Sequence, residues 1–226
     1  MGLKAYACTE DCEGTGGIIF AQTNLEARKS ASNIWGDGEL AGWNVHRAPG
    51  LDKYHAKGVP TWVLIADGWN FECNGCGMRM DETSLEDEGL SVEGVVGKEN
   101  GWSFCSHQCR TEYKSRRAAA DAFGEAFLDM MKDRLRDRFH GQDLCFGDHQ
   151  HHVYVPMWNE PLAVDQAWVS FSYPGAKYGA AHLKYEKNGE RNEDQISCGR
   201  WFYSVPNGDV PAYEEWAAKF PRKGYI

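Results

Sequence analysis

Hydrophobic and polar residues alternate in short stretches over the first 50 residues of the chain. The expected elements are strands over residues 3–8, from Ile18 onward and over residues 43–47, with a helix over about residues 25–34. The helix would turn Ala27, Ala31 and Ile34 toward a core, and Thr23 or Asn24 would cap its start. This order predicts a small strand–strand–helix–strand (ββαβ) unit at the N-terminus.

The strongest helical pattern lies between Ser106 and Phe139. Apolar residues recur mostly at three- and four-residue spacing, and the opposite face is charged. The stripe consists of Tyr113, Ala120, Phe123, Phe127, Met131, Leu135 and Phe139. One continuous helix of this length would be roughly 50 Å long, which is more than a small domain needs. We therefore expect it to bend near Gly124, to connect two domains, or to pair with another copy. The 113–139 stripe is accordingly either ordinary core or the seam of a homo-oligomer.

After Gly141 the pattern changes to the alternation that is typical of strands. Four stretches alternate in this way, over residues 151–155, 167–173, 180–186 and 196–205. Asn188 and Gly189 give a turn signal between the last two stretches. Pro211 is placed to begin a closing helix. The last third of the chain is therefore expected to form an antiparallel sheet with one helix.

Two cysteine pairs carry the clearest chemical signal in the chain. Cys73 and Cys76 have C-x2-C spacing, Cys105 and Cys109 have C-x3-C spacing, and 28 residues separate the pairs. Gly75 and Gly77 allow the tight turn of a zinc knuckle, and Ser106 opens a helix whose free amides favour thiolates. Four thiolates complete the tetrahedral shell of one Zn²⁺ and leave no open position, so one structural zinc site is expected. The alternative is four unrelated buried cysteines.

These elements together predict an α+β fold in three parts. The first is the ββαβ unit over residues 1–68, and the second is a zinc finger that continues into the long helix over residues 69–140. The third is the antiparallel sheet with its closing helix over residues 141–226, either separate or in one compact body with the long helix. Residues 61–66 (TWVLIA), just before the finger, fit either a strand or a short buried helical turn.

The segment from Phe71 to Arg117 resembles a treble-clef zinc finger. In that family a knuckle and a hairpin lead into a helix that carries the second ligand pair. Phe104, Cys105 and Ser106, with Cys109 close behind, resemble the FCS/MYM subgroup. The resemblance implies one four-cysteine zinc site, but it does not imply a function, because such fingers bind nucleic acid, bind protein or only stabilise a fold.

A wider resemblance links about half of the chain to a group of small phage and prophage proteins. It rests on residues 4–7 (KAYA), 18–21 (IIFA), 47–49 (RAP) and 65–77, which lead into the first cysteine pair. The resemblance implies a phage or prophage origin and no established activity.

A second group of metal-binding residue types lies between Cys145 and His152. His149 and His151 would point to the same side of a strand, and Cys145 lies close to them in sequence. Asp148, His152, His140 and His182 are the further candidates for completing a set. A site of this kind with an open position would suit a metal-dependent hydrolase or nuclease. The alternative is a loop of exposed imidazoles before a strand.

Cys8 and Cys12 repeat the C-x3-C spacing at the N-terminus. One pair does not supply four ligands. They are either spare thiols, a weak site, or partners of Cys145 or Cys198.

Charge is unevenly distributed in this acidic chain. The 33 acidic and 24 basic residues give a formal net charge of −9, which opposes nonspecific nucleic-acid binding. A basic group follows the last cysteine, and its members are Arg110, Lys114, Arg116 and Arg117. This group would either contact nucleic acid or neutralise the thiolates and the acidic spacer. Glu86, Asp87 and Glu88 in that spacer are a candidate surface for a basic partner.

The sequence thus favours a non-enzymatic, zinc-stabilised binding protein with a protein partner from host or phage. Its acidic surface could act as an inhibitory mimic of nucleic acid. The alternatives are a nucleic-acid-binding zinc-finger protein and a metal-dependent enzyme that uses His149 and His151. No apolar run is long enough to cross a membrane, and metal-spaced cysteines indicate a reducing compartment. We expect a cytoplasmic protein, in the host cytoplasm if it is encoded by a phage.

Overall fold

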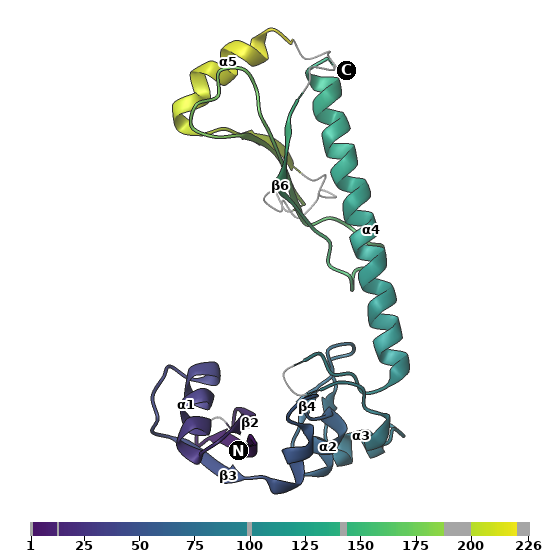
Figure 1. Cartoon of the computed structure of the whole chain (residues 1–226). Helices are drawn as coiled ribbons and strands as arrows, with labels where there is room; N and C mark the ends of the chain where they lie inside the picture. Colours follow the sequence, from purple (N-terminus) through teal and green to yellow (C-terminus); the bar gives the residue numbers. More distant parts are fainter. Residues whose placement is uncertain (1, 13, 99–100, 141–143, 188–199, 221–226) are drawn as a thin grey trace. The chain divides into compact units, whose positions relative to one another are not determined.

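The computed structural model divides the chain into two compact units, Met1–Tyr113 and Lys114–Ile226 (Figure 1). The structure describes residues 2–12, 14–98, 101–140, 144–187 and 200–220, and of residues 147–150 it describes the backbone alone. The predicted mixed α/β fold, with a long helix and a C-terminal four-stranded antiparallel sheet, is confirmed. The three-part division at residues 68 and 140 stays a prediction.

The first unit begins with a three-stranded antiparallel sheet in the order β2-β1-β3. Its strands are β1 (Lys4–Glu10), β2 (Gly16–Ala21) and β3 (Trp43–Arg47), and α1 (Asn24–Trp35) lies between the last two in sequence. Thr23 caps α1 in a capping box with Glu26, so the first of the two predicted caps is used. Ala27 and Ala31 are buried as expected. Ile34 was wrongly expected to face the core, because it is 60% exposed near the end of the helix.

Both faces of this sheet are covered, because the side chains on each face belong to a different hydrophobic cluster. Tyr6, Cys8 and Trp43 pack with α1 on one face. Ala5 and Ile18 pack on the other face with residues from the segment that follows the sheet, among them Leu64. Sequence reasoning left residues 61–66 open between a strand and a helical turn, and the structure makes them helix α2 (Thr61–Ala66). The segment between the sheet and the long helix contains η1 (Pro49–Tyr54), α2, β4 (Phe71–Glu72), β5 (Arg79–Met80), α3 (Glu82–Asp87) and η2 (Val92–Gly94).

The long helix α4 (His107–Arg138) begins in the first unit and continues into the second. It is one uninterrupted α-helix of 32 residues. Its C-terminal half supplies Met131 and Leu135, and Phe139 follows directly; all three are 0% exposed within the core of the second unit. Phe123 in the same stripe is 39% exposed. The stripe is therefore ordinary core along its C-terminal half, while a homo-oligomeric seam stays a prediction.

The second unit packs α4 and α5 on a four-stranded antiparallel sheet in the order β6-β7-β8-β9. Its elements are β6 (Phe146–Tyr154), β7 (Gln166–Phe171), β8 (Ala181–Glu186), β9 (Arg200–Ser204), η3 (Asn207–Asp209) and α5 (Val210–Ala218). Strand β6 begins five residues before the predicted stretch at 151–155, so much of the Cys145–His152 segment lies in the sheet. The predicted turn at Asn188 and Gly189 lies outside the described residues.

Aromatic rings dominate the core of the second unit. Phe139 lies 4.3 Å from Trp216 and 5.8 Å from Phe171, measured between ring centroids. Trp216 in turn stacks on Tyr173 at 5.2 Å. Phe139 therefore joins the end of α4 to the sheet and to α5.

None of the helices in the described part of the chain has the length and apolar character that a membrane span requires.

We predict that Phe139→Ala destabilises the second unit by about 3–5 kcal/mol, because the substitution removes a fully buried ring from a packed aromatic cluster. Phe123→Ala on the same helix is the matched control, and it should cost less than about 1 kcal/mol because its ring is partly exposed. Urea unfolding of both variants, followed by circular dichroism, measures the difference. Equal losses would contradict this description of the core.

Candidate metal centre

The first cysteine pair lies in a tight turn between two short antiparallel strands. β4 pairs with β5, with Phe71 opposite Met80. Inside the turn, the Cys73 N–H donates to the Met78 carbonyl and the Gly77 N–H donates to the Cys73 carbonyl, both at 2.9 Å. Gly77 has a φ of +76°, a conformation that glycine adopts without strain. The glycines seen in the sequence therefore form the turn that presents the first two thiols.

The second cysteine pair lies at the start of α4. The Ser106 hydroxyl accepts a hydrogen bond from the Cys109 N–H at 3.1 Å, as expected of a residue that caps a helix. Just before it, Phe104 exchanges two backbone hydrogen bonds with Val96, at 2.8 and 2.9 Å. Phe104 is 4% exposed and lies against Tyr113, with 5.4 Å between ring centroids. The start of the helix is thus fixed from both sides.

Two hydrogen bonds that do not involve sulfur connect the segments of the two cysteine pairs. The Asn74 N–H donates to the Ser103 carbonyl at 2.8 Å, and the Ser103 N–H donates to the Asn74 side-chain oxygen at 2.6 Å. The Ser103 hydroxyl also lies 2.7 Å from the hydroxyl of Thr61, in a buried position. Sequence reasoning missed Asn74 and Ser103. The only sequence signal was their position, since Asn74 lies within the first cysteine pair and Ser103 lies two residues before the second.

The four thiols lie close enough to share one metal ion. All four sulfur atoms, from Cys73, Cys76, Cys105 and Cys109, lie within 4.8 Å of one another. The Cys73–Cys109 and Cys76–Cys105 sulfurs are 3.5 and 3.8 Å apart. Disulfide sulfurs would be about 2.05 Å apart, whereas four sulfurs each about 2.3 Å from a tetrahedral Zn²⁺ are roughly 3.8 Å apart. The spacing fits a four-cysteine metal site, and it fits no disulfide among these residues.

Gly75 leaves the space that this arrangement needs. A Cβ atom built on Gly75 would lie 2.4 Å from the Cys109 sulfur and 3.3 Å from Phe104. The Gly75 N–H also points to the Cys73 sulfur at 3.4 Å, as does the Cys105 N–H at 3.3 Å. Backbone N–H groups that approach a sulfur stabilise the thiolate form that a metal requires. The turn is therefore shaped around the thiols.

Protonation differs among the thiols. Burial opposes ionisation of Cys73, but the N–H groups of Cys76, Cys105 and Gly75 outweigh it and lower the pKa of Cys73 to about 7. Burial, together with the hydrogen bond to Cys73, raises the pKa of Cys105 to about 11. The same two causes raise the pKa of Cys109. At neutral pH a metal ion must therefore displace protons from at least two thiols.

No second metal cluster occurs among the side chains that the structure describes. His151 and His152 are exposed on β6, and Cys145 is exposed just before that strand. The ring of His152 stacks on Trp168 at 4.4 Å rather than turning toward another ligand. The side chain of His149 lies outside the described residues, so its proposed pairing with His151 stays a prediction.

The remaining cysteines do not form a group in the part of the chain that the structure describes. Cys8 is buried in β1, with its sulfur 3.7 Å from the Tyr6 carbonyl oxygen. Cys12 is exposed. Cys198 lies outside the described residues, so its predicted pairing with either of them stays a prediction.

The basic group at the start of α4 is partly paired. Arg116 lies 3.9 Å from the Glu160 carboxylate and 5.1 Å from the ring of Trp158. Arg117 pairs with Asp121 at 3.0 Å, one helical turn on. Lys114 is exposed and Arg110 is half-buried. Two of the four candidate nucleic-acid contacts are therefore already engaged within the protein.

The candidate acidic surface lies at the C-terminal end of α3. Glu86, Asp87 and Glu88 are all exposed. The last turn of this helix contains no basic residue, and the carboxylates lie at the negative end of the helix. That position is electrostatically unfavourable, and a cationic partner would relieve it.

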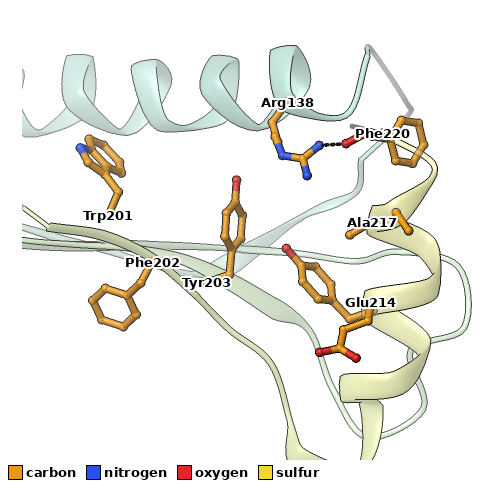
Figure 2. A pocket seen from close by; sticks show the side chains of 9 residues that line it. Arg138, Trp201, Phe202, Tyr203, Glu214, Ala217 and Phe220 are labelled. Carbon is orange, nitrogen blue, oxygen red and sulfur yellow. Dashed lines mark hydrogen bonds between the residues drawn. The ribbon is translucent and has the colours of Figure 1, made fainter. Parts of the chain in front are cut away.

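A separate hollow lies in the second unit, between α4, β9 and α5 (Figure 2). It encloses about 610 Å³ and is lined by Arg138, Trp201, Phe202, Tyr203, Tyr213, Glu214, Ala217, Ala218 and Phe220. The Arg138 guanidinium, drawn pointing into it, already donates to the Phe220 carbonyl. The hollow has the volume of a small-molecule site, but no described contact indicates a ligand for it.

Comparison with known proteins finds no matching protein-family model, no matching curated protein and no matching solved structure. The functional inferences below therefore rest on the chain itself.

We predict that the purified protein binds one metal equivalent per chain. Cys73→Ser, Cys105→Ser or Cys109→Ser should lose that metal, because each removes one of four ligands. Gly75→Ala should also weaken retention, because its methyl group would collide with the Cys109 sulfur. Elemental analysis after dialysis measures the content, and Cys145→Ser is the control. A second equivalent, lost on substitution of His151, would instead support the enzymatic alternative.

We also predict that metal binding weakens steeply with acidification. Cys105 and Cys109 have raised pKa values, so both hold protons at neutral pH and release them when the metal binds. Affinity should therefore fall at least about 100-fold for each unit that the pH is lowered between roughly 8 and 7. Competition with a chelator of known pH dependence measures this slope. A change below about tenfold per unit would contradict the protonation states described above.

Proposed function

We propose that this protein is a non-enzymatic binding protein whose first unit is stabilised by one structural Zn²⁺. The observation that carries the proposal is the closed set of four thiols at Cys73, Cys76, Cys105 and Cys109. Four protein ligands leave a tetrahedral ion no position for substrate or water, which is typical of a structural site. An all-sulfur set favours zinc over magnesium or calcium, which prefer oxygen.

Zinc would join segments that are far apart in the chain. It would tie the turn after β4 to the start of α4, and such sites contribute on the order of 10–16 kcal/mol of apparent binding free energy. The knuckle between two short strands, followed by a ligand pair at a helix start, supports a treble-clef finger of the FCS/MYM type. The phage or prophage origin, with a site of action in the host cytoplasm, rests on the short sequence elements alone.

We favour a protein with a basic surface as the partner that binds the acidic surface on α3. Support comes from the exposed carboxylates of Glu86, Asp87 and Glu88 and from the net charge of −9. Such a surface would resemble the charge of nucleic acid and could inhibit a nucleic-acid-binding host factor. The nucleic-acid-binding alternative would use Arg110 and Lys114 with Arg116 and Arg117. The ion pairs of the last two make it the weaker alternative.

We predict that Glu86→Lys, Asp87→Lys and Glu88→Lys together weaken partner capture from a host lysate by at least about tenfold, because they reverse the charge of the proposed surface. Capture by the unmodified protein should also fall between low and high salt. Quantitative pull-down with nuclease-treated lysate measures both effects.

The matched control reverses two exposed acids on α4, Glu125→Lys and Asp129→Lys. Partner capture that is independent of salt and equal in all three proteins would contradict the acidic surface. Retention that disappears after nuclease treatment would favour the nucleic-acid alternative.

A further inference from the structure

Strand alternation gives the C-terminal sheet two chemically different faces. Val169 and Leu183 lie opposite each other and are 2% and 1% exposed. They belong to the core that α4 and α5 cover, together with Phe139 and Trp216. The residues next to them in each strand point to the opposite face. Among the described residues, that face carries none of the buried apolar core, and its Ser170 is 1% exposed.

One register row crosses all four strands on this second face. Strand pairing places His152 opposite Trp168, Trp168 opposite Lys184, and Lys184 opposite Phe202. Directly paired residues point to the same side of a sheet. Neither ring is fully buried, since Trp168 and Phe202 are both half-buried. Along the row, the rings of Trp168 and Phe202 therefore alternate with the side chains of His152 and Lys184.

The contacts within the row hold the rings in place. The His152 ring stacks on Trp168, with centroids 4.4 Å apart. The Lys184 ammonium lies 6.0 Å and the Arg200 guanidinium 5.5 Å from the centre of the Phe202 ring. Both cations lie at the distance of cation–π contacts. Each ring is therefore supported by a neighbour on its own face of the sheet.

The neighbouring row adds a further aromatic residue. Tyr154 lies opposite Gln166, which lies opposite Glu186, and Glu186 lies opposite Arg200. Tyr154 is 52% exposed. Glu186 is the one carboxylate in these two rows, against the two permanent cations at Lys184 and Arg200. In a chain with a net charge of −9, these two rows together carry one net positive charge.

We propose that this face of the sheet binds single-stranded nucleic acid. Partly exposed rings can stack with unpaired bases, and adjacent cations can contact the phosphates between them. Trp168 and Phe202 are two strands apart, or roughly 10 Å, which leaves room for neighbouring bases of an extended strand. A duplex keeps its bases stacked on one another and cannot present them to these rings.

The charges on this face argue against an apolar protein segment as its partner. An apolar protein segment would remove Lys184 and Arg200 from water with Glu186 as the one carboxylate in the two rows, which is costly for the remaining cation. This inference is independent of the metal centre and of the acidic surface, and it differs from the finger alternative because it does not use Arg110 or Lys114.

The test is fluorescence anisotropy of the full chain with labelled oligo-dT and oligo-U of about 12 nucleotides, a length typical of single-strand sites. Both should bind, and a duplex of equal length should bind at least about tenfold more weakly. Trp168→Leu and Phe202→Leu should each weaken binding roughly 5- to 100-fold, because leucine keeps apolar bulk and removes the stacking surface. Trp62→Leu, a substitution of a partly exposed ring in the first unit, should change nothing.

Salt dependence tests the phosphate contacts separately. Two phosphates neutralised by Lys184 and Arg200 predict that binding weakens roughly sevenfold between about 50 and about 200 mM salt. Lys184→Gln with Arg200→Gln should flatten that dependence, whereas Arg110→Gln with Lys114→Gln should leave it unchanged. Thermal unfolding checks that each variant is folded.

Three results would overturn the proposal. The first is no binding of either oligonucleotide at low salt. The second is binding that depends on Arg110 and Lys114 but not on Trp168. The third is capture of a protein that requires Trp168 and Phe202 when oligonucleotides do not bind, which would assign this face to a protein partner. Failure of the acidic-surface test leaves these outcomes unaffected, because the two tests change different residues.

Discussion

The convergence of four sulfur atoms is the constraint on which the first unit depends. Cys73 and Cys105 are 1% and 5% exposed, so their thiols are withdrawn from water together. Four thiolates held this close would repel one another, and a cation at their centre turns this repulsion into a crosslink. The surrounding backbone is arranged for that purpose, since N–H groups from both ligand segments point at the Cys73 sulfur. A glycine occupies the one position where a side chain would collide with Cys109.

The second unit is organised by a different interaction, the packing of aromatic rings around Phe139. Helix α4 begins beside the thiols and ends in this cluster, so one element takes part in both the polar and the apolar centre. The described apolar core lies on one face of the sheet, and the row at His152, Trp168, Lys184 and Phe202 lies on the other. Two cations and one carboxylate in this row and the neighbouring one give an acidic protein a patch of net positive charge.

The residues of the four-cysteine site were predictable from sequence, whereas the pairing register of the strands was not. The cysteine spacing, the knuckle glycines and the helix cap at Ser106 each follow from a few neighbouring residues, and the structure brings the four thiols together as expected. Ile34 was misplaced because helical periodicity does not reveal which turn of a helix overhangs its sheet. The row at His152, Trp168, Lys184 and Phe202 could not be found from sequence. It depends on strand pairing across long connections and past an irregularity in β6, and alternation alone fixes neither.

The two units present different candidate surfaces, an acidic one in the first unit and a row of aromatic and basic side chains in the second. The account of the first unit rests on the claim that one ion is shared by four thiolates. X-ray absorption at the zinc edge of the intact protein tests it most directly. The account predicts four sulfur neighbours at about 2.3 Å and no lighter atom in the first shell. Fewer than four sulfurs, or nitrogen or oxygen neighbours at about 2.0 Å, would contradict it.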